Sequence, residues 1–177
     1  MPIQTTKQSV IAYEEFEKLT RPVLGLPVSW VWQGYGSAIF LEIGKLTLKK
    51  KKNRKDGIER ISYTGEYGVM IEWSWRVERS RSIYFGSWST DKVIENRLAK
   101  LKDRTLEGIE VEGRLPELVI RLSGGLWVHS FASAESQPRW CLFLDRKRSP
   151  VEWLVSERGK LIKETQSQWV TKLRLDS

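Results

Sequence analysis

The ten residues from Val69 to Glu78 (VMIEWSWRVE) alternate between apolar side chains and side chains that are nearly all polar. Because successive side chains of a β-strand point to opposite faces, this period of two predicts a strand with one wholly apolar face. The apolar face carries Val69, Ile71, Trp73, Trp75 and Val77. The pattern therefore predicts a central strand of the core, with both tryptophans buried.

Two segments have apolar residues at helical spacing, residues 7–20 (KQSVIAYEEFEKLT) and 90–103 (TDKVIENRLAKLKD). Ser9 suits the start of the first helix and Thr90 or Ser89 the start of the second, and Pro22 suits the end of the first one. A third segment, 163–175, is predicted to be helical or frayed. Shorter apolar or alternating runs between turn residues predict strands at 28–33, 38–43, 46–50, 60–63, 82–88, 118–122, 126–131, 140–144 and 151–155.

Three short matches recur in the same order along the chain. Residues 21–28 resemble 104–111 at a spacing of 83, whereas residues 44–46 resemble 124–126, and 72–73 resemble 152–153, at a spacing of 80. A tandem duplication explains the common order, and chance similarity of common residue types is the alternative. The predicted fold is α+β: a tandem pseudo-repeat of a helix followed by an antiparallel β-meander, with two sheets sharing one core.

The predicted domain organisation is a single compact domain over residues 1–177. The first copy covers about 7–88, the second about 90–162, and residues 163–177 form a C-terminal tail. No linker rich in Gly, Ser or Pro separates the two copies, so we do not expect independent domains.

The composition supports a core that needs no disulfide or metal. Hydrophobic residues make up 40% of the 177 positions, and nine are tryptophans. The single cysteine, Cys141, excludes an intramolecular disulfide and a thiolate cluster. The chain has no run of eighteen apolar residues and no signal-peptide pattern at its start. We therefore expect a cytoplasmic protein with no membrane span and no cofactor.

The net charge of +8 is concentrated in one segment. Residues 49–56 (KKKKNRKD) hold six cations and one anion, so they contribute +5 and leave +3 for the rest of the chain. Such a run can bind the phosphates of a nucleic acid, and a solvated hairpin loop is the alternative. The candidate nucleic-acid-binding residues are Lys49, Lys50, Lys51, Lys52, Arg54 and Lys55.

Catalytic and metal-binding signatures are weak. If residues 134–138 close a hairpin, Phe131 lies opposite Cys141, and His129 becomes a diagonal neighbour of that thiol. A buried cysteine more often packs as a small hydrophobe. One histidine and one cysteine cannot complete a structural zinc site. No segment of the sequence matches the glycine-rich pattern of a phosphate-binding loop.

The polar side of the central strand is a further candidate site. Glu72, Arg76 and Glu78 are expected on one face, and Glu42 on a strand of the same sheet. Carboxylates beside an arginine suit a small polar ligand or hydrolytic chemistry. A solvated sheet face with ordinary ion pairs is the alternative.

Several short motifs, spanning roughly residues 24–145, resemble a family of small uncharacterised bacterial proteins. They are Gly25-Leu26-Pro27, Gln33-Gly34-Tyr35-Gly36-Ser37, Leu41-Glu42-Ile43-Gly44, Gly65-Glu66-Tyr67, Trp75-Arg76, Leu122-Ser123-Gly124-Gly125-Leu126 and Gln137-Pro138-Arg139-Trp140-Cys141-Leu142. Tyr67 stands where that family has tryptophan, and Pro138-Arg139 is an insertion. The resemblance implies a bacterial, intracellular protein and implies no activity.

These observations favour a non-enzymatic protein-binding module, of an immunity-like or adaptor kind. Its expected partner is another protein or a second copy of the chain, for example through an exposed edge strand. Nucleic-acid binding through residues 49–55 and a small-ligand site at Glu42, Glu72 and Arg76 are the alternatives.

Overall fold

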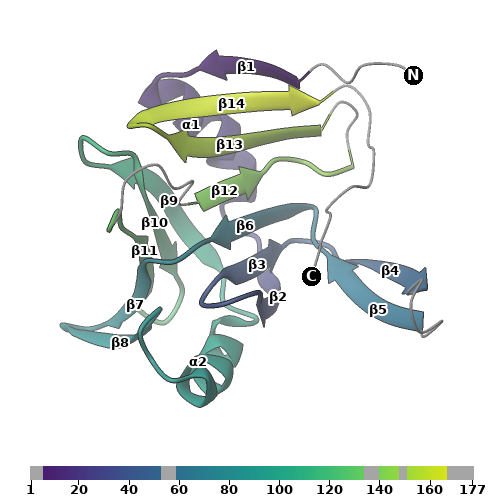
Figure 1. The fold of residues 1–177 in the computed structure, drawn as a ribbon, viewed down its shortest axis with the longest axis vertical. Coiled ribbons are helices and arrows are strands. Elements are labelled where there is room, and N and C mark those ends of the chain that lie inside the picture. The colour runs from purple at the N-terminus through teal and green to yellow at the C-terminus, as the bar shows by residue number, and fades with distance from the viewer. Residues whose placement is uncertain (1–5, 53–58, 134–139, 148–150, 167–177) are drawn as a thin grey trace.

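A computed structural model describes residues 6–52, 59–133, 140–147 and 151–166 of the chain (Figure 1). Within these ranges the helices are α1 (Tyr13–Thr20) and α2 (Asp91–Leu98), each continued by a short 3₁₀ turn, η1 (Arg21–Val23) and η2 (Ala99–Leu101). The remaining elements are strands that pair antiparallel. The fold class is therefore α+β with antiparallel sheets, as predicted.

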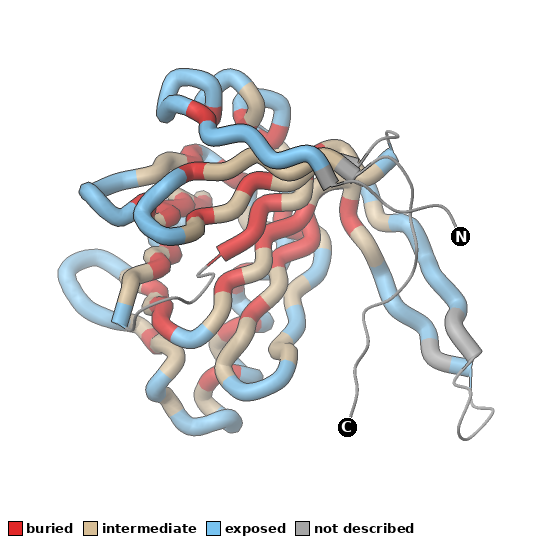
Figure 2. Tube along the Cα trace, turned by 45° about the horizontal axis from the view of Figure 1, so that its top comes forward, coloured by how far each residue is buried: buried red, intermediate tan, exposed pale blue. Residues whose placement is uncertain are grey.

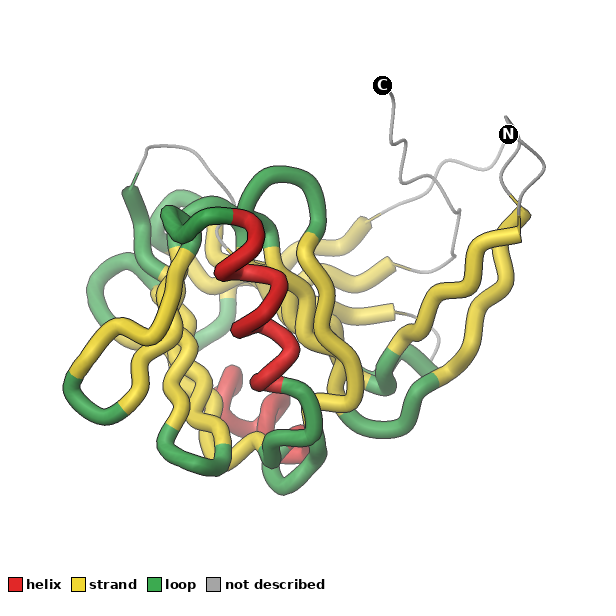
Figure 3. The backbone as a smooth tube through the Cα atoms, turned by 90° about the horizontal axis from the view of Figure 1, so that it is seen from below, coloured by secondary structure: helices red, strands yellow, loops and turns green. Residues whose placement is uncertain are grey.

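Two sheets and one separate hairpin contain all the described strands. The larger sheet has the order β1 (Thr6–Val10), β14 (Lys160–Gln166), β13 (Val151–Glu157), β12 (Trp140–Phe143), β6 (Tyr67–Ile71), β3 (Ile39–Ile43) and β2 (Val28–Gln33). The smaller sheet has the order β8 (Ser82–Gly86), β7 (Trp75–Arg79), β11 (Leu126–Ser130), β10 (Glu117–Leu122) and β9 (Leu106–Glu112). The hairpin, which we call the ribbon, pairs β4 (Thr47–Lys52) with β5 (Glu59–Thr64) and projects from the body (Figures 1 and 3).

The chain changes sheet twice. After β6 in the larger sheet it passes to β7 and β8 of the smaller sheet, and after β11 in the smaller sheet it passes to β12 of the larger sheet. Each half of the chain therefore contributes strands to both sheets.

The core consists of alternate side chains of the strands, together with the apolar sides of both helices. Trp75 and Trp140 are its largest fully buried side chains, and Phe16 of α1 packs edge-on against Trp140, with ring centroids 6.0 Å apart. Figure 2 shows the buried residues running along the inside of the sheets. The buried residues of both halves form one continuous hydrophobic cluster.

The predicted single strand from Val69 to Glu78 is wrong. It is two strands, β6 and β7, joined by a turn in which the Ser74 N–H donates to the Glu72 carbonyl oxygen at 2.8 Å. Val69, Ile71, Trp75 and Val77 are buried as expected. Trp73, however, has a positive φ of 58° and an exposed side chain, because the backbone reverses there as it leaves one sheet for the other.

The predicted helix over residues 7–20 is also wrong in its first part. Residues 6–10 form β1, which pairs with β14, and the helix begins only at Tyr13. Residues 163–166, predicted to be helical or frayed, belong to β14, and 167–175 lie outside the described residues. Both errors have one cause: the strands at the two ends of the chain stabilise each other, and no local pattern reports a partner so distant in sequence.

The first elements of the two halves correspond at a constant shift. The starts of α1 and α2, of η1 and η2, and of β2 and β9 each differ by 78 positions, against the predicted 80 to 83. Hydrogen bonds link the two segments in matching pairs around a bridge between Pro27 and Thr105. In the first pair, the Gly25 N–H donates to the Leu106 carbonyl oxygen at 2.9 Å, and the Asp103 N–H donates to the Val28 carbonyl oxygen at 2.8 Å. In the second pair, the Leu106 N–H donates to the Leu26 carbonyl oxygen at 2.9 Å, and the Val28 N–H donates to the Arg104 carbonyl oxygen at 2.8 Å.

Candidate functional site

The polar residues predicted to share one face are divided between the two sheets. Glu42 lies in β3 of the larger sheet, and Arg76 and Glu78 lie in β7 of the smaller one. Glu72 belongs to the turn between β6 and β7, where burial raises the pKa of its carboxyl. The predicted site at Glu42, Glu72 and Arg76 is therefore not formed, because the chain changes sheet within it.

Arg76 and Glu78 do meet, on the outer face of the smaller sheet. Arg76 Nε lies 2.6 Å from a carboxylate oxygen of Glu78, and this hydrogen bond lowers the pKa of that carboxyl. His129 Nε2 lies 3.6 Å from the other oxygen of Glu78. This arrangement is a surface ion pair with a neighbouring histidine.

The predicted pairing of Phe131 with Cys141 is wrong. His129 is in β11, opposite Val119 and Arg76, whereas Cys141 is in β12, opposite Met70 and Val155. The two strands belong to different sheets, and residues 134–138, predicted as the hairpin loop between them, lie outside the described residues. Burial also raises the pKa of the Cys141 thiol. The geometry offers no Cys–His nucleophile.

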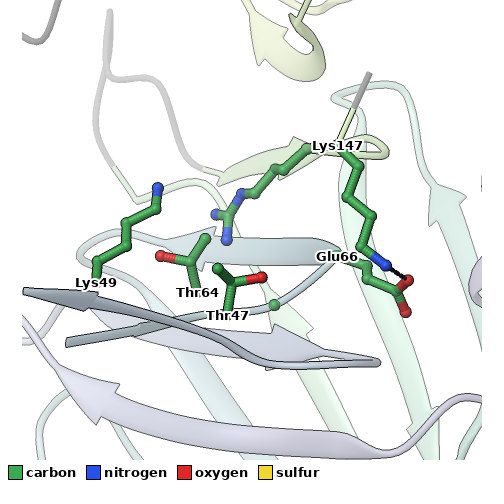
Figure 4. A pocket seen from close by; sticks show the side chains of 7 residues that line it. Thr47, Lys49, Thr64, Glu66 and Lys147 are labelled. Atoms are coloured by element: carbon green, nitrogen blue, oxygen red, sulfur yellow. Dashed lines mark hydrogen bonds and ion pairs between the residues drawn. The ribbon is translucent and has the colours of Figure 1, made fainter. Parts of the chain in front are cut away.

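A cleft of about 440 Å³ lies where the ribbon joins the larger sheet (Figure 4). We call it the ribbon cleft. Its lining residues are Thr47, Lys49, Thr64, Gly65, Glu66, Arg146 and Lys147. Thr47 and Thr64 are directly opposite each other in the ribbon register, and Figure 4 shows their side chains and that of Lys49 on the same side of the ribbon.

Two carboxylates pair with Arg146 and Lys147 of the ribbon cleft. Arg146 pairs with Glu42, which also accepts the Gly65 N–H at 2.9 Å. Lys147 pairs with Glu66. The hydrogen bond from Lys147, and a second one from the Lys45 N–H at 2.9 Å, lower the pKa of the Glu66 carboxyl.

The Arg146 guanidinium is closely confined. It lies 4.4 Å from the centroid of the Phe143 ring, and a Cβ atom at Gly68 would collide with it. Only 13% of the Arg146 side chain is exposed. Sequence reasoning missed Arg146, Thr47 and Thr64, because residues 146–150 read as a simple turn and the threonines as ordinary strand positions.

Four of the six candidate basic residues, Lys49 to Lys52, lie in β4 of the ribbon. Lys49 and Lys50 follow each other in β4, and Lys50 Nζ lies 3.7 Å from Glu59 across the hairpin. Lys51 and Lys52 continue β4, while Arg54 and Lys55 lie outside the described residues. The ring of Tyr63 in β5 contacts Trp30 of the larger sheet, with centroids 5.3 Å apart, and so attaches the ribbon to the body.

A second surface carries three strongly exposed aromatic side chains, Tyr35, Trp73 and Trp88. Their exposed fractions are 93%, 54% and 91%. Tyr35 lies in the β2–β3 loop, Trp73 in the β6–β7 turn, and Trp88 between β8 and α2. We call them the aromatic set.

Trp75 ties the three aromatic loops together. Its indole N–H donates to the Ser37 carbonyl oxygen at 2.6 Å, and its carbonyl oxygen accepts the Ser87 N–H at 2.9 Å. The Ser37 hydroxyl in turn donates to the Trp73 carbonyl oxygen at 3.1 Å. The loops that bear Tyr35 and Trp88 are therefore both hydrogen-bonded to Trp75, the first to its indole and the second to its backbone.

Comparison with known proteins finds no match to a protein-family model, a curated protein or a solved structure. Among the described residues, no helix is long and apolar enough to cross a membrane. The same part of the chain has no group of three or more His, Cys, Asp or Glu residues placed to hold a metal ion.

Proposed function

We propose that this protein is a non-enzymatic protein-binding module, of an adaptor or immunity-like kind, whose partner covers the aromatic set. The observation that carries the proposal is Trp73. A bulky residue in the left-handed region costs about 1 to 2 kcal/mol. Full burial of a large aromatic side chain contributes roughly 2 to 3 kcal/mol, and the Trp73 indole, which is 54% exposed, lacks about half of that contribution. A partner that covers Trp73 supplies the missing part.

The residue types and their support favour a binding surface. Tryptophan and tyrosine are enriched among the few residues that dominate protein–protein affinity. Loops that are held before the partner arrives lose less conformational entropy on binding. The hydrogen bond from the Trp75 indole N–H to the Ser37 carbonyl oxygen, and the one from the Ser87 N–H to the Trp75 carbonyl oxygen, supply that restraint.

Affinity capture with matched variants tests the proposal. Trp73→Gly removes the indole and relieves the left-handed backbone, so this variant should fold at least as well as the natural chain. Trp127→Gly, which removes a partly exposed tryptophan from β11, is the control. We expect the natural chain and the control to retain a common stoichiometric protein, with Trp73→Gly lowering its recovery at least tenfold.

Recovery of the same proteins by Trp73→Gly and the natural chain would contradict the proposed role of Trp73. Sedimentation of the purified chain identifies a second copy as the partner if its self-association weakens in the same variant.

We further propose that the two halves descend from a tandem duplication, each copy being a helix followed by a meander. The constant shift of 78 between α1–η1–β2 and α2–η2–β9 supports this idea. So do the matching hydrogen bonds around Pro27 and Thr105.

A further inference from the structure

One row of apolar side chains crosses the whole outer face of the larger sheet, the face turned away from the core. The strand registers place these side chains in line, one from each of the seven strands. The row runs from Val10 of β1 through Ile162, Val155, Cys141, Met70 and Phe40 to Trp32 of β2. We call it the outer row. Its members lie outside the hydrophobic cluster of the core, because alternate residues of a strand point to opposite faces.

The outer row is open to solvent at both ends. Val10 and Trp32 are 64% and 39% exposed, and the members between them are half-buried, apart from Cys141, which is buried. A sheet face that only meets water normally carries polar side chains, as in the usual alternation of an antiparallel sheet. A continuous apolar row is typical of a face that packs against a second layer, and exposed apolar patches mark interaction surfaces.

The row beside it, on the side of the ribbon cleft, engages its polar groups within the chain. Arg146, which lies over this row, pairs with Glu42. The Glu164 carboxylate accepts hydrogen bonds from Gln8 Nε2 at 2.6 Å and from the indole N–H of Trp153 at 2.5 Å. Because these groups keep their partners when another surface covers the face, burying them costs less than burying unpaired groups.

The size of the face suits a second copy of the chain. Seven strands about 4.8 Å apart span about 34 Å, and three rows of side chains, the outer row and one on each side, span about 20 Å along the strands. Each copy would therefore bury about 600 to 700 Å², or roughly 1,300 Å² for a pair, which reaches the lower limit of stable interfaces. A two-fold pair uses the same patch on both copies, and a row that is apolar from end to end matches itself.

We propose that the protein forms a two-fold dimer in which the outer faces of two larger sheets pack together, outer row against outer row. This surface is distinct from the aromatic set, whose three side chains lie in loops and turns between the strands. The dimer therefore leaves the proposed protein-binding surface to a different partner.

Sedimentation of the full chain over a concentration series tests the proposal. We expect a monomer–dimer equilibrium with a Kd of roughly 1 to 100 µM, because the interface lies at the lower limit of stable ones. Raising the salt concentration should leave the dimer unchanged or strengthen it, because salt screens ion pairs and does not weaken apolar contacts.

Two matched pairs of variants locate the interface. Trp32→Asp and Val10→Asp place a carboxylate in the outer row and should each weaken the dimer at least tenfold. Trp127→Asp and Ile83→Asp make the same changes at residues of similar exposure on the smaller sheet, 41% and 67%, and should change the Kd by less than about twofold. Trp73→Gly, in the aromatic set, should leave the dimer unchanged. A thermal melt of each variant confirms that it is folded.

Four results would overturn the proposal. A chain that stays monomeric up to about 1 mM, tenfold above the expected range, would mean that another occupant covers the outer row. Equal losses from the outer-row variants and their controls would remove the assignment to this face. A dimer weakened by Trp73→Gly and not by Trp32→Asp would assign self-association to the aromatic set. Dissociation as salt rises would assign the contact to ion pairs.

Discussion

The indole N–H of Trp75 donates to the Ser37 carbonyl oxygen across 2.6 Å, and so joins the core of the smaller sheet to the β2–β3 loop. Trp75→Phe removes this donor and leaves a cavity in a fully buried position. We expect a loss of about 2 to 4 kcal/mol in the free energy of unfolding, measured by urea denaturation. Trp127→Phe, at a partly exposed position, should cost less than about 1 kcal/mol. Equal losses would show that the bond and the buried site contribute nothing specific.

Glu72 and Glu78 should affect stability at neutral pH in opposite directions. The pKa of Glu72 is higher in the folded protein than in the unfolded chain. Its carboxyl therefore stabilises the folded state at a pH below the pKa of the unfolded chain, and this stabilisation is lost as the pH rises through the pKa of the folded protein. Glu72→Gln should therefore stabilise the protein at pH 7 and have little effect once the pH is below about 4.

For Glu78 the sign is opposite, because the hydrogen bond from Arg76 lowers the pKa of its carboxyl in the folded protein. The carboxyl therefore stabilises the folded state at a pH above the pKa of the unfolded chain, and this stabilisation is lost as the pH falls through the pKa of the folded protein. Glu78→Gln should cost a few tenths of a kcal/mol at pH 7, and this cost should fade in acid. Urea denaturation at pH 4 and pH 7 measures both variants. The same sign for both at pH 7 would contradict the assigned environments.

Gly25 and Asp103 lie 78 positions apart, the same shift as between the starts of α1 and α2, and both have positive φ angles, 82° and 65°. A Cβ atom at Gly25 would meet no heavy atom within 4 Å, so Gly25→Ala tests the backbone alone. We expect it to cost about 1 to 2 kcal/mol, whereas Asp103→Gly should be neutral or slightly stabilising. Thermal unfolding of the two variants distinguishes them. A stable Gly25→Ala would mean that the left-handed turn is not required.

Cys141 should react with thiol reagents only when the protein unfolds. Its side chain is buried in β12, and burial raises the pKa of the thiol, so little thiolate is available in the native state. A colorimetric disulfide reagent at pH 8 should label the protein slowly in buffer and rapidly in denaturant. Rapid labelling of the native protein would indicate an accessible thiolate and would revive a chemical role for this residue.

The strands of the two sheets could largely be predicted from the sequence because most of them have one buried face. Ile39, Leu41 and Ile43 of β3 show this, since all three are fully buried. The membership of each sheet could not be predicted. Apolar and polar residues continue to alternate from Ile71 through Trp73 to Trp75, although the chain passes from one sheet to the other there. The positive φ angle of Trp73 cannot be recognised from this pattern either.

The candidate site was harder to predict for a related reason. The basic ribbon was visible as a run of lysines, but its cleft depends on Arg146, whose partner Glu42 is 104 positions away. Such a pairing is decided by how the sheet assembles. Likewise, β1 is a strand only because β14, at the other end of the chain, pairs with it.

The two changes of sheet have a consequence for how the chain reaches its native state. During synthesis, one edge of β6 has no partner strand until β12 is made. β1 has no partner until β14 is made, when nearly the whole chain has been synthesised. Contacts between residues so far apart in sequence slow folding and leave sheet edges open to aggregation. A cut between the halves, after Ser89, would leave the first fragment without three strands of each sheet, and the second without four strands of the larger sheet and two of the smaller one. We therefore expect neither fragment to fold alone, and the intact chain to unfold in one cooperative step.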